Sequence, residues 1–154
     1  MKTKAYLGQI ERLNHRIKFK INELNNLKEM ALVIKSAGCD DMKIQSGTKE
    51  NHMENTIIAI ADTEKELEKL IQTLIDKKHA IISEIEALEN TNEYAVLIMR
   101  FVECKTISEI ALAMNYSSKN IERILANAVE NFTVMYGTEK GLVNKECEKS
   151  VLKV

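Results

Sequence analysis

The sequence predicts an all-α protein in which a long antiparallel helical hairpin, of coiled-coil type, precedes a helix-turn-helix domain. Three observations predict this fold. The 154 residues include no proline and only five glycines, so long segments lack helix breakers. Apolar residues recur every three or four positions through most of the first ninety residues. Between residues 97 and 132, two capping signals mark two short helices separated by a tight turn.

The first long helix is predicted over residues 1–36. Its apolar stripe follows three- and four-residue spacing and consists of Ile10, Leu13, Ile17, Ile21, Leu24, Leu27, Ala31 and Ile34. Gly38 and the pair Asp40-Asp41 end this helix. Residues 37–52, with Ser46 and Gly47, are too polar for a core and are predicted to form a linker.

The second long helix is predicted from about Met53 to Leu88. Its apolar positions follow an unbroken three-four rhythm at 57, 60, 64, 67, 71, 74, 78, 81, 85 and 88. Eight of these ten positions hold Ile or Leu, and the exceptions are Glu64 and Lys78. About five heptads of this kind indicate a coiled coil.

Charge indicates how the two long helices pair. Residues 1–36 hold eight Lys or Arg and three Asp or Glu, a net charge of +5, whereas residues 53–90 hold four Lys and nine Asp or Glu, a net charge of −5. Opposite charge favours pairing of the two helices with each other in an antiparallel hairpin. Further apolar residues on the second helix leave surface for a second copy of the chain: Ile58, Leu70, Ile75 and Ile82.

Local signals define the helices of the third segment. A supporting helix is predicted over about Asn92–Val102, with Val96, Leu97 and Phe101 inward. Thr106 and Glu109 form a capping box, so a helix begins near Ile107 and buries Ile107, Ile110, Ala111 and Met114. Asn115 occupies the left-handed position of the turn. Ser117 caps a second helix, whose buried stripe is Ile121, Ile124, Leu125, Ala128 and Phe132.

The outward face of this last helix predicts contact with DNA. A helix-turn-helix places its second helix in the major groove, where first-turn polar side chains reach base edges and phosphates. The residues expected there are Ser117, Ser118, Lys119, Asn120, Glu122 and Arg123. Lys105 and Thr106 lie where the preceding helix would cross the DNA backbone, so they are expected to contact phosphate.

The same segment resembles region 4 of bacterial sigma factors, which reads the −35 promoter element. The resemblance rests on Met99-Arg100-Phe101, on the Thr-x-x-Glu-Ile-Ala box from Thr106 to Ala111, and on the capped helix from Ser117 to Phe132. It implies that Ser118, Lys119, Glu122 and Arg123 read bases. Residues 5–132 are also similar to a phage-encoded family with an N-terminal coiled coil before such a domain, whose members are described as phage transcriptional regulators.

Three domains follow: 1–90 for the hairpin with linker 37–52, 91–132 for the sigma-region-4-like helix-turn-helix, and 133–154 for a C-terminal tail interrupted by Gly137 and Gly141. Residues 91–132 carry four Lys or Arg and five Glu, a net charge of −1. Because cations supply most DNA affinity, a single copy would bind weakly, and a homo-oligomer on paired sites is expected.

The expected function is a sequence-specific DNA-binding regulator of a phage or prophage. Its partners would be double-stranded DNA and, through the coiled coil, further copies of the chain or RNA polymerase. Two alternatives stay open: a small terminase subunit for DNA packaging, which would form a ring, and a sigma-like module that binds protein without reading DNA. The negative charge of residues 91–132 favours the second of these alternatives.

Other classes of function find no support in the sequence. Neither a phosphate-binding loop nor a catalytic constellation is found, so no enzyme and no cofactor are expected. Cys39, Cys104 and Cys147, like the three histidines, match no metal-site spacing. With no apolar run of about 18 residues and no signal peptide, we expect no membrane span and a location in the bacterial cytoplasm.

Overall fold

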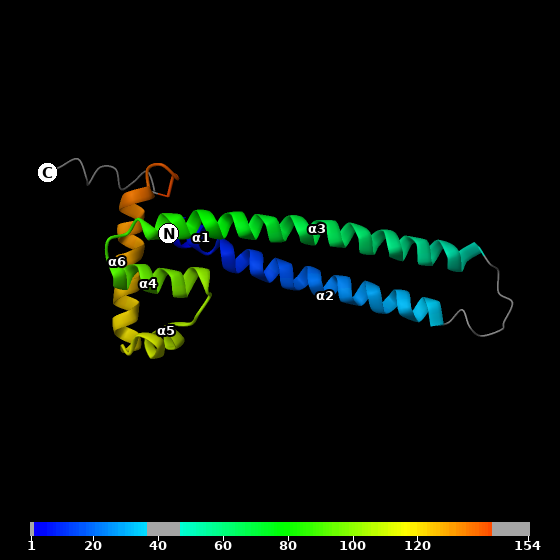
Figure 1. Cartoon of the computed structure of the whole chain (residues 1–154), viewed down its shortest axis with the longest axis horizontal. Helices are drawn as coiled ribbons and strands as arrows, with labels where there is room; N and C mark the ends of the chain where they lie inside the picture. Colours follow the sequence, from blue (N-terminus) through cyan, green and yellow to red (C-terminus); the bar gives the residue numbers. More distant parts are fainter. Residues whose placement is uncertain (1, 37–46, 143–154) are drawn as a thin grey trace. The chain divides into compact units, whose positions relative to one another are not determined.

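The computed structural model of the chain describes residues 2–36 and 47–142, and the side chains of 2–36 and 51–142. Within these residues every regular element is helical and no strand occurs, which confirms the predicted all-α class (Figure 1). The helices are α1 (Lys2–Leu7), α2 (Gln9–Ser36), α3 (Gly47–Glu86), α4 (Thr91–Leu97), the π-helical η2 (Ile98–Val102), α5 (Ile107–Met114) and α6 (Ser118–Tyr136).

The chain divides into two compact units whose boundaries differ from the predicted ones. Unit 1 combines Met1–Arg12 with Ile75–Val154, and unit 2 is Leu13–Leu74. The sequence instead suggested a boundary near residue 90, with the first residues in the hairpin. The difference arises because α1 contacts α6, and because Glu84 of α3 pairs with Lys140 after α6. Local sequence patterns do not report such long-range contacts.

Contacts between α1 and α6 hold the N-terminal segment in unit 1. The hydroxyls of Thr3 and Thr133 are hydrogen-bonded at 2.7 Å, and the ring centroids of Tyr6 and Phe132 lie 6.3 Å apart. Phe132 is fully buried. Leu7 of α1, Ile10 of α2, Ile81 and Ile85 of α3, and Leu88 just after α3 are also buried in unit 1.

The predicted single helix over residues 1–36 is wrong at Gly8, where α1 ends and α2 begins. The Arg12 guanidinium donates to the carbonyl oxygen of Ala5 across this break. A Cβ atom at Gly8 would lie 3.0 Å from the carbonyl oxygen of Lys4, a contact that only glycine avoids without a local shift. Glycine therefore lets the chain pass from α1 to α2 without this close contact.

Residues 133–142, which the sequence assigned to a C-terminal tail, belong to the folded unit. α6 continues to Tyr136, and Leu142 is buried after a turn. Lys140 donates a hydrogen bond to the Tyr6 hydroxyl at 2.8 Å and forms an ion pair with Glu84. Burial raises the pKa of Tyr6, so its hydroxyl stays protonated and donates to both oxygens of Glu84 at 3.0 and 2.9 Å. Residues 143–154 lie outside the described residues.

Unit 2 is an antiparallel pairing of α2 with α3, as predicted from their charges. Lys20 pairs with Glu66 at 2.7 Å, and Lys28 pairs with Glu64 at 3.0 Å. The predicted linker 37–52 is too long, because α3 already begins at Gly47. Residues 37–46 of that linker lie outside the described residues.

Most of the predicted inner positions of unit 2 are buried or half-buried, but one row of the predicted heptads on α3 is shifted by one residue. Thr56 and Thr63 are buried on α3, whereas Ile57 and Glu64, the predicted positions, are exposed. The threonine hydroxyls donate to the carbonyls of His52 and Ala59 at 2.8 Å, so these polar groups are satisfied between the helices. On α2, Lys20 likewise takes the inner position expected for Ile21, and its amine reaches Glu66.

Candidate nucleic-acid interface

The segment predicted to meet DNA consists of α5 and α6, joined by a three-residue turn. Thr106 caps α5: its hydroxyl accepts from the Glu109 N–H at 3.4 Å, and its own N–H donates to the Glu109 carboxylate at 2.7 Å. The predicted capping box is therefore confirmed. These bonds fix the start of α5 and with it the direction in which the helix leaves the preceding loop.

Asn115 makes the turn possible. Its backbone is left-handed, with φ 55° and ψ 40°, as the sequence predicts. The N–H of Tyr116 then donates to the carbonyl of Ala111 at 3.0 Å, which closes α5. Ser117 starts α6 by accepting a hydrogen bond from the Asn120 N–H at 3.3 Å, so its predicted capping role is also confirmed.

Substitution of Asn115 tests this backbone requirement. Asn115→Ala is expected to lower the free energy of unfolding by about 1 kcal/mol, because a Cβ without a compensating polar group disfavours the left-handed region. Asn115→Gly should match or exceed the stability of the wild type, because glycine adopts this conformation freely. Chemical denaturation followed by circular dichroism measures both. Equal losses in the two variants would contradict the interpretation.

A small apolar core holds α5 and α6 against the supporting segment. Its fully buried members are Val96, Ile110 and Ile121, and Ala111 is 7 % exposed at the place where α6 approaches. Partly buried side chains surround them: Met99, Ile107, Met114, Ile124 and Leu125. Val129 is also buried on α6 although the predicted stripe omitted it.

The supporting segment is not the single α-helix predicted over residues 92–102. α4 gives way to the π-helical η2 at Ile98, and the N–H of Glu103 donates to the Ile98 carbonyl at 3.0 Å. The Arg100 guanidinium donates to the Lys105 carbonyl at 2.8 Å. The π-helical turns of η2 and the Arg100 side chain together position the residues that lead into α5. Arg100 therefore has a structural role in this domain.

The first turns of α6 present polar side chains to solvent. Ser117, Ser118, Lys119, Glu122 and Arg123 are exposed, and Asn120 is half-buried. The Arg123 guanidinium donates to the Asn120 side-chain oxygen at 2.9 Å, which orients both groups. No acidic residue occupies the first turn of α6, so the partial positive charge of the helix end adds to that of Lys119.

The residues at the start of α5 are more constrained than the sequence suggested. The amine of Lys105 is paired with Glu103 at 2.7 Å, and Thr106 is exposed but engaged in its cap. Glu93, counted in the net charge of −1, is only 8 % exposed and accepts from the Asn131 side chain at 2.8 Å. Several of the five glutamates are therefore bound by neighbouring groups and do not form an open acidic surface.

The cap of α5 makes the stability of unit 1 dependent on pH. Hydrogen bonds from the Thr106 backbone N–H and then from its hydroxyl lower the pKa of Glu109. Because the folded pKa lies below the unfolded value, this stabilisation is present at neutral pH and is lost as pH falls through the folded pKa.

We therefore expect a weaker dependence of unfolding free energy on pH between about pH 5 and pH 3 in Glu109→Gln than in the wild type. Denaturant titrations across this range measure the difference. Glu130→Gln removes an exposed charge from α6 outside the cap and serves as the control. Identical pH profiles for Glu109→Gln and the wild type would argue against the cap as the source.

Comparison with protein families places most of this architecture in one group. The model of the family described as "Protein of unknown function (DUF1492)" matches residues 33–133, about two thirds of the chain, from the end of α2 to Thr133 in α6. The chain belongs to this family. DUF1492 proteins are phage-associated. Searches of the curated proteins and of the solved structures found no match.

The residues of this DUF1492 chain that sequence reasoning missed are positioning residues. They are Glu93 with Asn131, Arg100 with the Lys105 carbonyl, and the cluster of Tyr6, Glu84 and Lys140. Two of these had a local signal. Asn90 lies three residues before Glu93 and caps α4 through its side chain, so a Glu at that position pointed to a role in the helix start. Arg100 lies in the Met99-Arg100-Phe101 segment that carries the resemblance to sigma region 4, although its bond to the Lys105 carbonyl was not predicted.

Two further observations describe the DUF1492 chain beyond this segment. Residues 2–36 and 51–142 contain no group of three or more His, Cys, Asp or Glu side chains arranged to hold a metal ion. In the part of the chain that the structure describes, none of the helices combines the length and apolar character needed to cross a bilayer.

Proposed function

We propose that this protein is a DNA-binding transcriptional regulator of a phage or prophage, acting in the cytoplasm of the bacterial host. α5 and α6 form its helix-turn-helix, of the sigma-region-4 type, and α6 enters the major groove. The observation that carries the proposal is the exposed polar surface just beyond the Ser117 cap, formed by Ser118, Lys119, Glu122 and Arg123 and presented by a turn fixed at Asn115.

Each of these side chains has a role in the proposal. Lys119 and Arg123 bind phosphate or the O6 and N7 atoms of guanine, and Glu122 accepts from the amino group of cytosine. Ser118 and Asn120 donate to base edges or phosphates. Lys105 and Thr106 contact the DNA backbone at the start of α5, with the Lys105 amine exchanging Glu103 for phosphate. The hairpin of α2 and α3 serves for oligomerisation or for contact with RNA polymerase.

The direct test is selection of bound duplexes from a random pool by the full-length protein. The proposal expects enrichment of a defined sequence, with binding that weakens as salt increases, because cations on the protein replace counterions on DNA. The absence of any enriched sequence, together with no salt-dependent binding to duplex DNA, would refute it.

The two alternatives have distinct outcomes. A small terminase subunit would form a ring of many copies, so native mass spectrometry showing a ring of eight or more chains would favour DNA packaging. A sigma-like protein module would retain host RNA polymerase in a pull-down from nuclease-treated lysate while failing to bind DNA. The pairing of Lys105 with Glu103 favours the second alternative over the first, because it reduces the free positive charge beside α5.

A further inference from the structure

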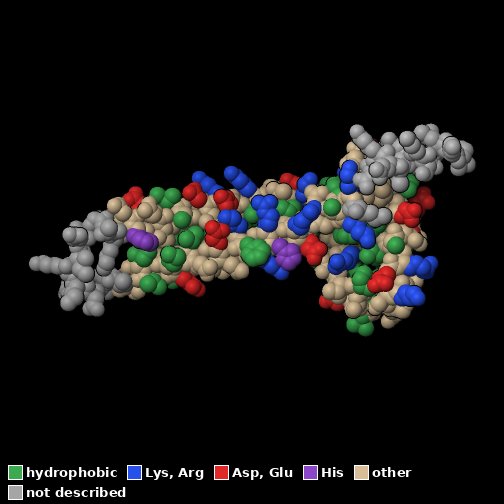
Figure 2. All heavy atoms as spheres, turned by 180° about the vertical axis from the view of Figure 1, so that it is seen from behind, with side chains coloured by type: hydrophobic (Ala, Val, Ile, Leu, Met, Phe, Trp, Pro, Cys, Tyr) green, Lys and Arg blue, Asp and Glu red, His purple; other side chains and the backbone are tan. Residues whose placement is uncertain are grey.

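Unit 2 encloses little apolar surface of its own. Among its described side chains, residues 13–36 and 51–74, Leu24 is the only buried apolar one, at 8 % exposed. The other buried positions are Thr56 and Thr63. A segment of this size with so thin a core needs additional cover to be stable. Hydrophobic side chains accordingly reach the surface along the hairpin (Figure 2).

One side of the hairpin carries apolar side chains from both helices. On α3, Ile57, Glu64 and Ile71 follow each other at seven-residue spacing and therefore lie in one row. On α2, Ile21 lies seven residues before Lys28. The ion pair between Lys28 and Glu64, at 3.0 Å, places the two rows on the same side.

The rows also run beside each other at similar heights. α2 and α3 are antiparallel and are joined by the long side chains of Lys28–Glu64 and of Lys20–Glu66, so Ile21 lies within about two helical turns of the level of Ile71. In the other direction along the hairpin, Ile57 on α3 and Leu32 on α2 both lie beyond the Lys28–Glu64 pair. The surface thus has an apolar layer, an ionic layer and a second apolar layer. The exposed fractions are 41 % for Ile21 and Ile71, 54 % for Ile57 and 67 % for Leu32.

We infer that unit 2 pairs with unit 2 of a second copy through this surface, which we call the Ile21–Ile71 face, to form a four-helix bundle. A two-fold axis along the hairpin brings each level of one copy onto the same level of the other, so that Ile21 and Ile71 of both copies lie in one apolar region. Lys28 of each copy then faces Glu64 of the other. A two-fold axis across the hairpin would instead place Lys28 against Lys28, so charge favours the first arrangement and sets α2 antiparallel on the partner's α3.

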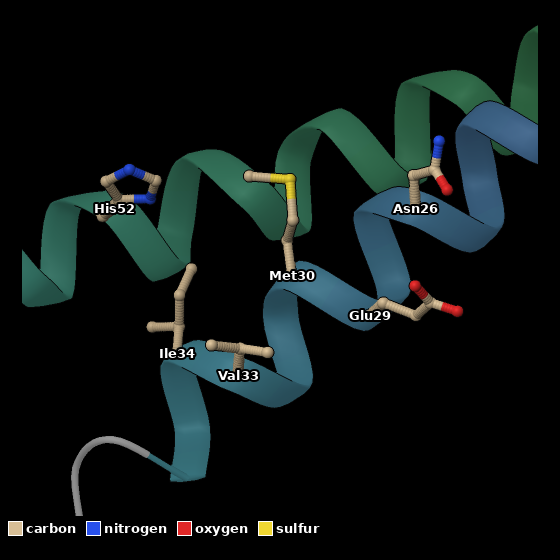
Figure 3. Close-up of a pocket in the computed structure, with 6 residues that line it drawn as sticks. All are labelled: Asn26, Glu29, Met30, Val33, Ile34 and His52. Carbon is tan, nitrogen blue, oxygen red and sulfur yellow. The ribbon is translucent and has the colours of Figure 1, made fainter.

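The opposite flank of the hairpin is less suited to a second copy. There α2 contributes Phe19 and Val33. Phe19 lies about 200° around the helix from Ile21, and Val33 lies about 200° from Lys35, which continues the row of Ile21 and Lys28. A hollow of about 400 Å³ opens on this flank, lined by Asn26, Glu29, Met30, Val33, Ile34 and His52. Figure 3 shows Met30 and Ile34 extending from α2 toward α3, where His52 lies. α3 presents His52 and Glu66 on this side, so the apolar surface comes from one helix only.

The test measures the mass of the full-length protein by sedimentation over a concentration series without DNA, so its result is independent of the proposed DNA contact. The inferred dimer gives a specific form to the oligomerising role proposed for the hairpin of α2 and α3. We expect a reversible dimer whose Kd rises about 100-fold in Ile21→Ser/Ile71→Ser. Phe19→Ser/Val33→Ser, which removes more exposed apolar side chains from the other flank, should leave the Kd unchanged. A wild-type monomer at all concentrations, or equal losses in the two variants, would overturn the inference.

A charge variant keeps the test valid if the double serine variant fails to fold. Lys28→Glu places like charges opposite Glu64 within and between copies, so it should also weaken the dimer, and Lys28→Glu/Glu64→Lys should restore it. Full dimerisation of Lys28→Glu would contradict the face.

Cross-linking tests the orientation. In a background with the three cysteines replaced by serine, a mixture of Lys28→Cys and Glu64→Cys chains should form disulfide-linked pairs, whereas Lys28→Cys alone should stay unlinked. Efficient linkage of Lys28→Cys to itself would overturn the arrangement.

Discussion

Lys119→Ala/Arg123→Ala is expected to reduce affinity for the selected DNA site by between about tenfold and a thousandfold, because each side chain contributes a phosphate or guanine contact. Both side chains are exposed on α6, and the bond from Arg123 to Asn120 is itself exposed, so the loss reflects contacts to DNA more than damage to the fold. The slope of log affinity against log salt should also fall by about 1.8, since two cations no longer displace counterions. Fluorescence anisotropy with a labelled duplex measures both quantities.

The matched control removes the same amount of charge from unit 2. Lys65 and Lys69 are exposed on α3, and Lys65→Ala/Lys69→Ala should leave affinity and salt slope unchanged. Thermal unfolding of both double variants checks that the fold is intact. Full affinity in Lys119→Ala/Arg123→Ala would reject α6 as the recognition helix, and a parallel loss in the control would show that binding depends on net charge alone.

Phe132→Ala is expected to lower the free energy of unfolding of unit 1 by about 3–5 kcal/mol, the cost of emptying a fully packed aromatic site. Phe132 lies where α1 meets α6, with its ring centroid 6.3 Å from that of Tyr6 and 4.9 Å from that of Tyr136. The near-ultraviolet circular dichroism of the tyrosines should weaken as well, because their fixed surroundings are lost. Denaturant unfolding followed by far-ultraviolet circular dichroism gives the free energy.

Val134→Ala provides the control two residues along the same helix. Val134 is 78 % exposed, so its truncation should change stability by no more than about 0.5 kcal/mol. If Phe132→Ala were as mild as Val134→Ala, the association of α1 with α6 would not be a stabilising part of unit 1.

Features set by neighbouring residues could be predicted from the sequence. The Thr106–Glu109 box, the left-handed Asn115 and the Ser117 cap each involve residues within a few positions of one another, so the pattern and the geometry coincide. The exposure of Lys119, Glu122 and Arg123 follows from the same periodicity that buries Ile121 and Phe132. The all-α class follows from the scarcity of helix breakers.

Features that depend on distant partners could not be predicted. On α3, Thr56 and Ile57 both fit three- and four-residue spacing, so the spacing does not decide which of them faces α2. The structure buries Thr56 and exposes Ile57, and in this orientation Glu64 and Glu66 pair with lysines of α2. A local pair was missed as well: Lys105 carries a charge suited to phosphate, but the carboxylate of Glu103, two residues earlier, pairs with its amine. The place of residues 2–12 beside α6 has no local signature, since it rests on contacts such as that between Thr3 and Thr133.

The hydrogen bond between Thr3 and Thr133 joins residues 130 positions apart in the chain. During synthesis, the helix that contains Thr3 and Tyr6 therefore leaves the ribosome long before α6 exists to receive it. Unit 2, which ends at Leu74 within α3, can pair beforehand. Unit 1 must consequently form late, and a pause or truncation before residue 133 would leave its first helix without the surface on which it docks.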